Sequence, residues 1–140
     1  MRLEKHMDGL KEVLREIESA LEDAGGLVSH QRRLAAMLSL GICDIVEIYF
    51  HKLGIMKEGA RIKHNIFKKG NMEELLSNQI TAPLRSIKNI ERLLETAVDI
   101  ENSRDDMFYG SPLDEEDLLK EKIDEFLDAQ KAKLFGMPKN

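Results

Sequence analysis

The chain has 140 residues, which is the size of a typical single domain and enough to bury a core without disulfide bonds. Charged residues make up 34% of it and prolines number only 3, a composition that favours helices. The formal net charge of −5 argues against nucleic-acid binding by overall charge and leaves a local basic patch as the only route to such a role.

The single cysteine, Cys43, excludes an intramolecular disulfide and is typical of a protein in a reducing compartment. Residues 1–6 are charged and lack the apolar core of a signal peptide. The longest near-apolar run, Leu34 to Val46, is interrupted by Ser39 and Asp44 and is too short to span a bilayer. We therefore expect a cytoplasmic protein without a membrane segment.

The first predicted helix runs from about Leu3 to Ala24. Its apolar residues recur every three or four positions, the spacing of one buried helix face: Leu3, Met7, Leu10, Leu14, Ile17 and Leu21. Gly25 and Gly26 are expected to end this helix, because glycine adopts the left-handed conformation of a C-terminal cap.

The second predicted helix begins near Ser29, runs to about Leu53 and stops at Gly54. Its apolar residues are denser than those of the first helix and lie on more than one face: Leu34, Met37, Leu38, Leu40, Ile42, Ile45, Val46, Ile48, Tyr49 and Phe50. Such a helix lies either at the centre of a bundle or in a dimer interface.

The third quarter of the chain predicts shorter elements. Residues 54–70 are basic and are expected to form a loop and then a short helix, and residues 72–79 predict another short helix. Residues 81–83, Thr-Ala-Pro, are typical of a helix start, so a further helix is expected from Pro83 to about Asn102.

The C-terminal part predicts a break from Arg104 to Gly110 and then a last helix that ends near Leu134. Ser111 is expected to cap this helix, with Pro112 at its first position and acids in its first turn. Residues 136–140 are expected to be frayed. No stretch alternates as a strand does, so residues 1–140 predict one all-α domain, an up-down bundle of four or five helices.

Motifs for metals, cofactors and nucleophilic catalysis are missing from the sequence. The four histidines are spread along the chain, without a His-Glu-x-x-His motif or a cysteine pair: His6, His30, His51 and His64. Glu47 and His51 are four residues apart on one helix face, but one pair offers too few ligands for a metal site. We therefore predict no metal and no cofactor, and a core role for Cys43.

Basic residues cluster between positions 57 and 69, close to a predicted helix start: Lys57, Arg61, Lys63, His64, Lys68 and Lys69. Such a cluster suits the binding of phosphate. A solvated loop in an acidic protein has the same composition, so both interpretations stay open.

The acidic segment 99–128 contains a single arginine, Arg104, and Tyr109 follows it five residues later. The arginine is either a salt-bridge partner of the acids around it or a guanidinium held in a ligand-binding cleft together with the tyrosine.

Residues 103–110, Ser-Arg-Asp-Asp-Met-Phe-Tyr-Gly, followed by a Ser-Pro turn and a helix with an acidic start, resemble the Arg-x4-6-His region of the HEPN superfamily. These are small helical domains of prokaryotic toxins, RNases and nucleotidyltransferase partners. The order of the predicted helices extends the resemblance over most of the chain. Residues 20–24 and 34–54 resemble the first two family helices, and residues 61–64 resemble the polar linker after them.

The resemblance implies a homodimer that binds RNA, a nucleotide or a partner protein, with Arg104, Asp105 and Tyr109 in a cleft at the dimer interface. Tyr109 stands where the family's RNases have histidine, and a tyrosine with its ordinary pKa of about 10 is a poor acid or base near neutral pH. Conventional RNase activity is therefore not expected. In the family an acid of the second helix approaches the motif arginine, which points to Glu47 first and Asp44 second.

Two alternatives to this function stay open. One is an RNase toxin of a toxin–antitoxin system, in which Arg104 and His64 are the candidate catalytic residues. The other is a structural partner of a small nucleotidyltransferase. In that case Tyr109 is a candidate for covalent nucleotidylation, because tyrosines near this motif can be modified in that way in the family.

Overall fold

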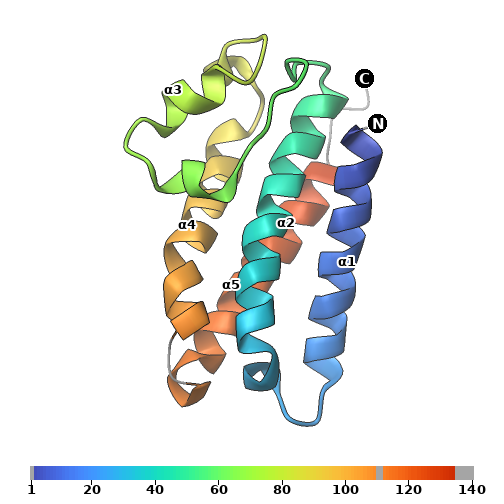
Figure 1. The fold of residues 1–140 in the computed structure, drawn as a ribbon, viewed down its shortest axis with the longest axis vertical. Coiled ribbons are helices and arrows are strands. Elements are labelled where there is room, and N and C mark those ends of the chain that lie inside the picture. The colour runs from blue at the N-terminus through green and yellow to red at the C-terminus, as the bar shows by residue number, and fades with distance from the viewer. Residues whose placement is uncertain (1, 110–111, 135–140) are drawn as a thin grey trace.

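A computed structural model describes residues 2–109 and 112–134. These residues form five α-helices and three short 3-10 turns, and they contain no strand. The elements in chain order are α1 (Arg2–Glu22), η1 (Leu27–His30), α2 (Gln31–Lys52), η2 (His64–Lys68), α3 (Met72–Ser77), η3 (Leu84–Ser86), α4 (Ile90–Tyr109) and α5 (Pro112–Leu134). In Figure 1 the four long helices lie side by side, with the short α3 beside the upper part of α4. The predicted all-α bundle is thereby confirmed.

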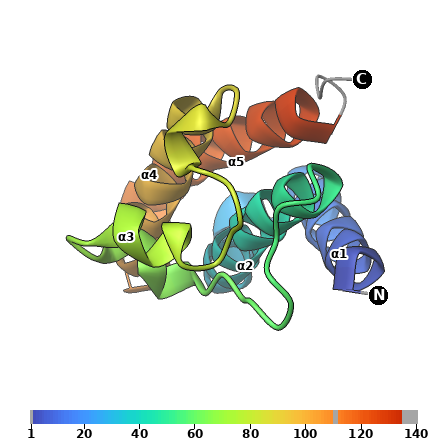
Figure 2. The ribbon, with the colours of Figure 1, turned by 90° about the horizontal axis from the view of Figure 1, so that it is seen from above.

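The long helix α2 is the centre of the bundle and packs against α1, α4 and α5, as the view from above also indicates (Figure 2). Its inward residues are fully buried: Leu34, Leu38, Ile42, Ile45 and Ile48. A Cβ at Gly41 would lie 2.7 Å from Phe126 Cε1 on α5, so only glycine allows these two helices to approach so closely. Of the two sequence interpretations of this helix, the central position in the bundle is the observed one.

The segment Leu27–Lys52 is the one helix of the described chain that is long and apolar enough to cross a membrane. The run Leu34 to Val46 is therefore part of a longer apolar helix than the sequence prediction considered. The fold buries 72% of the most apolar 18-residue stretch of this helix, as expected for the core helix of a bundle.

The buried face of α1 differs slightly from the predicted stripe. Leu10 and Ile17 are buried as expected, but Val13 and Ala20 complete the face, while Leu21 is 53% exposed. The change corresponds to a small rotation of the helix, because positions 10, 13, 17 and 20 follow the same three-four spacing.

The helix predicted from Pro83 to Asn102 is wrong at both ends. Residues 84–86 form a 3-10 turn, and Asn89 has a φ of 61°, which interrupts the chain before α4 starts at Ile90. Asparagine tolerates this left-handed conformation better than most residues.

The expected break from Arg104 to Gly110 is also wrong for the described residues 104–109, which are the last turns of α4. The physical reason is Met107, which is fully buried on the same helix face as Ile100, seven residues earlier. Apolar burial therefore continues the helix through the charged residues around it. The predicted cap Ser111 and the predicted frayed tail 136–140 lie outside the described residues.

Candidate functional site

The predicted site residues fall into two groups at different places in the bundle. Five of them line a cleft of about 680 Å³ between α1, α2 and the segment 61–65: Asp44, Glu47, Arg61, Lys63 and His64. We call this the α1–α2 cleft. The other three lie on the last turns of α4, whose C-terminal end is the lower one in Figure 1: Arg104, Asp105 and Tyr109. We call this region the α4 tip.

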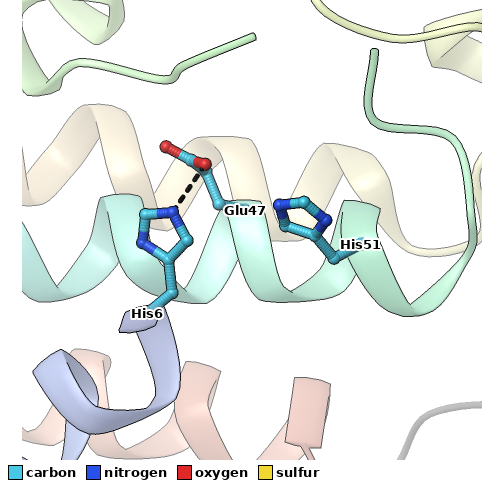
Figure 3. A group of neighbouring side chains, drawn as sticks. All are labelled: His6, Glu47 and His51. Atoms are coloured by element: carbon cyan, nitrogen blue, oxygen red, sulfur yellow. Dashed lines mark ion pairs between the residues drawn. The ribbon is translucent and has the colours of Figure 1, made fainter. Parts of the chain in front are cut away.

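His6 also lines the α1–α2 cleft and had no role in the sequence prediction. Its Nδ1 is 2.7 Å from Asp44 Oδ1. Its Nε2 is 2.8 Å from Glu47 Oε1, the contact drawn as a dashed line in Figure 3. The other oxygen of Glu47, Oε2, accepts a hydrogen bond of 2.9 Å from the Ile62 backbone N–H. One carboxylate therefore connects α1, α2 and the segment 61–65.

The Asp44 carboxylate packs directly on the α1 backbone at Gly9, since a Cβ there would lie 2.9 Å from Asp44 Oδ2. Burial raises the pKa of Asp44 above its ordinary value, and the hydrogen bond to His6 opposes this rise in part. Cys43 is buried in the same region, and burial raises the pKa of its thiol far above the ordinary value. The cysteine is therefore a protonated core residue at neutral pH, as predicted.

A buried carboxylate on α4, Glu101, joins the cleft to α4. It is 1% exposed, accepts a hydrogen bond of 2.9 Å from the Ser39 hydroxyl, and lies 2.9 Å from His64 Nδ1 through its other oxygen. Sequence reasoning missed this residue. The available signal was its position four residues after Ala97, on the apolar stripe of the helix, where an acid requires a partner.

An exposed groove of about 720 Å³ lies at the α4 tip, and of the three predicted residues there only Tyr109 lines it. Aromatic and cationic side chains meet in this groove. Arg32 and Arg33 line it from the start of α2, and Phe108 and Tyr109 line it from α4. The two aromatic rings are 5.2 Å apart, and Tyr109 is 75% exposed, the largest value among the apolar and aromatic side chains described as exposed.

Arg104 lies one turn before Phe108, with its Cζ atom 5.4 Å from the centre of the phenyl ring. Its Nε is buried and has no hydrogen-bond partner among the described residues. Its ion-pair contact is with the neighbouring Asp105 at 4.0 Å, and Asp105 also pairs with Lys68 at 3.3 Å. A guanidinium with an unused buried N–H is unusual, because buried donors are nearly always hydrogen-bonded.

His30 holds the turn between α1 and α2, which borders the groove at the α4 tip. Its Nε2 is 2.7 Å from Asp23 Oδ2 and its Nδ1 is 2.9 Å from Glu16 Oε2. Hydrogen bonding to Asp23, and then to Glu16, raises the pKa of His30. The pKa of Asp23 is lowered, first by the Gly25 backbone N–H and then by His30.

The α2 acids expected beside the motif arginine have other partners within the chain. Glu47 and Asp44 both contact His6, whereas the described ion pair of Arg104 is with Asp105. The buried acid closest in sequence to Arg104 is instead Glu101, on α4 itself.

Two groups of side chains in the described part of the chain have the composition and spacing to hold a metal ion: His6 with Glu47 and His51, and Asp99 with Glu121 and Glu125. The sequence prediction had counted only the Glu47–His51 pair. It missed His6, because that ligand comes from a helix about forty residues earlier and only the packing of α1 on α2 brings it near.

Comparison of the chain with models of protein families, with curated proteins and with solved structures finds no match. The HEPN resemblance therefore stays a prediction from the sequence.

Proposed function

We propose that this protein is a cytoplasmic, HEPN-like homodimer that binds single-stranded RNA or a nucleotide at the α4 tip, without conventional RNase activity. The observation that carries this function is Tyr109, which is 75% exposed in a groove that it shares with Phe108, Arg32 and Arg33. The ring of Tyr109 is therefore accessible for stacking, and tyrosine combines a large apolar ring with a polar hydroxyl, which suits a binding surface.

The chemistry of the tip matches both parts of a nucleotide. Base stacking on an aromatic ring is favourable for any base, and arginines beside the ring pair with the phosphates. Although the whole chain carries a net charge of −5, the two adjacent arginines make the start of α2 locally basic. Local charge of this kind is sufficient for a short strand or a mononucleotide.

Arg104 does not line the groove itself but supports it through contact with Phe108. Its guanidinium packs on Phe108 and keeps one buried N–H without a partner. Loss of this guanidinium would remove the cation that packs on the Phe108 ring, one of the two rings that line the groove.

The homodimer rests on the HEPN resemblance, in which the motif arginines of two subunits line one cleft. Light scattering on the purified protein should give the mass of two chains. A single-chain mass at every concentration tested would contradict the dimer while leaving the binding test below unaffected.

Binding is tested with a fluorescently labelled single-stranded RNA, with unlabelled ADP as competitor to separate strand binding from nucleotide binding. Tyr109→Ala should weaken binding about 5- to 150-fold, the equivalent of roughly 1–3 kcal/mol for one stacked base. Tyr109→Phe keeps the ring and should bind nearly as the natural protein does. Arg104→Ala should also lose binding while retaining its helical content by circular dichroism.

Arg85→Ala is the matched control for these variants, because Arg85 is 70% exposed and pairs with Glu73 instead of lining the tip. Its affinity should be unchanged. Unchanged affinity in both Tyr109→Ala and Arg104→Ala would overturn the proposed site.

An RNase is the second candidate function, and the His64–Glu101 pair favours it. A histidine oriented by a carboxylate is a common acid–base arrangement, and this one lies in the α1–α2 cleft with Arg61 and Lys63. Incubation of RNA with the protein in the presence of a chelator tests it. Cleavage that disappears in His64→Ala would support this candidate, and intact RNA would exclude metal-independent cleavage.

A partner of a nucleotidyltransferase is the third candidate, and the exposure of Tyr109 favours it, since a modified hydroxyl must be accessible. Mass spectrometry of the protein after co-expression with a nucleotidyltransferase encoded beside it would show an added nucleotide on Tyr109. The variant Tyr109→Phe lacks the acceptor oxygen and should show no addition.

A further inference from the structure

Three side chains from two helices lie close to one another (Figure 3). His6 comes from the second turn of α1, while Glu47 and His51 are one turn apart on α2. One potential ligand atom from each lies within 4.8 Å of the other two. Ligand atoms around a tetrahedral zinc ion are roughly 3.4 Å apart, given bonds of about 2.0–2.2 Å. Small side-chain adjustments would therefore place all three on one ion.

Glu47 provides an observation independent of this spacing. Its side chain is 4% exposed, and its Oε2 accepts a hydrogen bond from the Ile62 N–H. Its Oε1 is buried and accepts no hydrogen bond from any described residue, although it lies 2.8 Å from His6 Nε2 as an ion-pair contact. This contact with His6 is therefore the oxygen's described polar contact and lacks hydrogen-bond geometry, and a cation between the two groups would be bound by both.

Asp44 orients the histidine of this group. The contact of 2.7 Å between Asp44 Oδ1 and His6 Nδ1 leaves Nε2 directed at Glu47. A carboxylate on one ring nitrogen with the metal on the other is the usual arrangement around metal-bound histidine, where it fixes the ring and increases its basicity.

We propose that His6, Glu47 and His51 form a binding site for Zn²⁺ or a similar divalent transition metal, with Asp44 holding His6 in place. Two imidazoles and one carboxylate favour such ions over Mg²⁺ or Ca²⁺, which prefer oxygen ligands. Three protein ligands leave a fourth position open, as in catalytic zinc sites. His6 and Glu47 also line the α1–α2 cleft of about 680 Å³, which gives the ion a route from solvent.

The second acidic group, Asp99 with Glu121 and Glu125, does not qualify, because a cation already occupies it. Lys122 Nζ lies 2.6 Å from Asp99, 3.3 Å from Glu121 and 3.1 Å from Glu125. At the site formed by His6, Glu47 and His51, by contrast, the described ion-pair contact of Glu47 is with the imidazole of His6, which is itself a metal ligand in proteins.

The test uses the full chain, freed of metal with a chelator and titrated with Zn²⁺ by calorimetry. The natural protein should bind one ion per chain. His6→Gln and His51→Gln should each abolish this binding, and Asp44→Asn should weaken it roughly 10- to 100-fold, as removal of an orienting carboxylate does at other metal sites. Titration with Co²⁺ should produce the visible absorption of a tetrahedral ion without a thiolate charge-transfer band, because Cys43 is not a ligand.

His30→Gln is the matched control, since His30 also lies between two carboxylates, Glu16 and Asp23, and should leave Zn²⁺ binding unchanged. Circular dichroism verifies that each variant is folded. If His6→Gln unfolds, the Zn²⁺ affinity of His51→Gln is the deciding measurement. Absence of one-to-one binding in the natural protein, or its persistence in His51→Gln, would overturn the site. Neither outcome bears on RNA binding at the α4 tip.

Discussion

The α4 tip and the α1–α2 cleft both contain charged residues, but Arg33 at the tip is exposed, whereas His6 and Glu47 in the cleft are largely buried. At the tip, Arg33 is 65% exposed and its contact with Glu16 is 3.7 Å long. In the cleft, Glu47 and His6 are 4% and 19% exposed and lie 2.8 Å apart. Exposed ion pairs contribute little to stability, whereas loss of one partner of a buried pair is costly. The tip is therefore free to exchange water for a ligand, while the cleft is part of what holds α1 on α2.

The largest expected effect is on stability in the cleft. Glu47→Ala removes the carboxylate that contacts His6 and the Ile62 N–H, and it should lower the free energy of unfolding by about 3–5 kcal/mol. Arg33→Ala at the tip should lower it by at most about 1 kcal/mol. Urea denaturation measures both, and a similar loss in the two variants would remove the distinction between the regions.

Ser39→Ala should have the next largest effect. It leaves Glu101, which is 1% exposed, without the hydroxyl that donates to it, at an expected cost of about 1–3 kcal/mol. The exposed Ser29, whose hydroxyl donates to the Gly26 carbonyl, offers a matched control, and Ser29→Ala should change stability by no more than about 0.5 kcal/mol. Thermal unfolding of the two variants measures the difference. A larger loss of stability in Ser29→Ala than in Ser39→Ala would contradict the role of the buried Ser39–Glu101 hydrogen bond.

A smaller effect concerns the salt dependence of RNA binding at the tip. Each phosphate contact to a single strand contributes about 0.7 to the slope of log affinity against log salt concentration. Arg32→Ala should therefore reduce the slope by roughly 0.7, and Lys63→Ala in the cleft should leave it unchanged. Anisotropy titrations over a range of salt concentrations give both slopes, and a change confined to Lys63→Ala would move the RNA site to the cleft.

The smallest effect is the pH dependence of the turn at the tip. The pKa of His30 is raised, so its contribution to stability is complete below the ordinary histidine pKa and is lost as the pH rises through the raised value. The pKa of Asp23 is lowered, so its contribution is lost only as the pH falls through that lowered value. The turn is therefore held most firmly in mildly acidic solution. An NMR titration should give a lower pKa for His30 in Asp23→Asn, and an unchanged value would show that this pair does not form.

Much of the fold was predictable from the sequence, because amphipathic spacing reports burial directly. The spacing predicted α1 and α2 closely, and Gly26 and Gly54, both with positive φ, lie where the two helices were expected to end. The errors lie where local composition and packing disagree. Arg104 and Asp105 are charged residues that predicted a break, but burial of Met107 keeps this segment helical. Asn89, with its positive φ, delays the start of α4, and the spacing of apolar residues does not indicate this.

The candidate sites were predictable only in part. The sequence identified Glu47 and His51 as neighbours because one helix carries both. It could not identify His6 as their companion, since that contact depends on how α1 packs on α2 at Gly9. Likewise, Tyr109 was selected from the sequence, but Arg32 and Arg33 share its groove only because the chain turns back between α1 and α2 and brings the start of α2 beside the end of α4.

The separation of roles between the two regions is tested most directly by measuring the affinity of one labelled single-stranded RNA for two variants in parallel. Tyr109→Ala at the tip should weaken binding about 5- to 150-fold, whereas His51→Gln beside the cleft should bind the RNA as the natural protein does. Full affinity in Tyr109→Ala together with lost affinity in a folded His51→Gln protein would contradict the assignment of the ligand to the α4 tip.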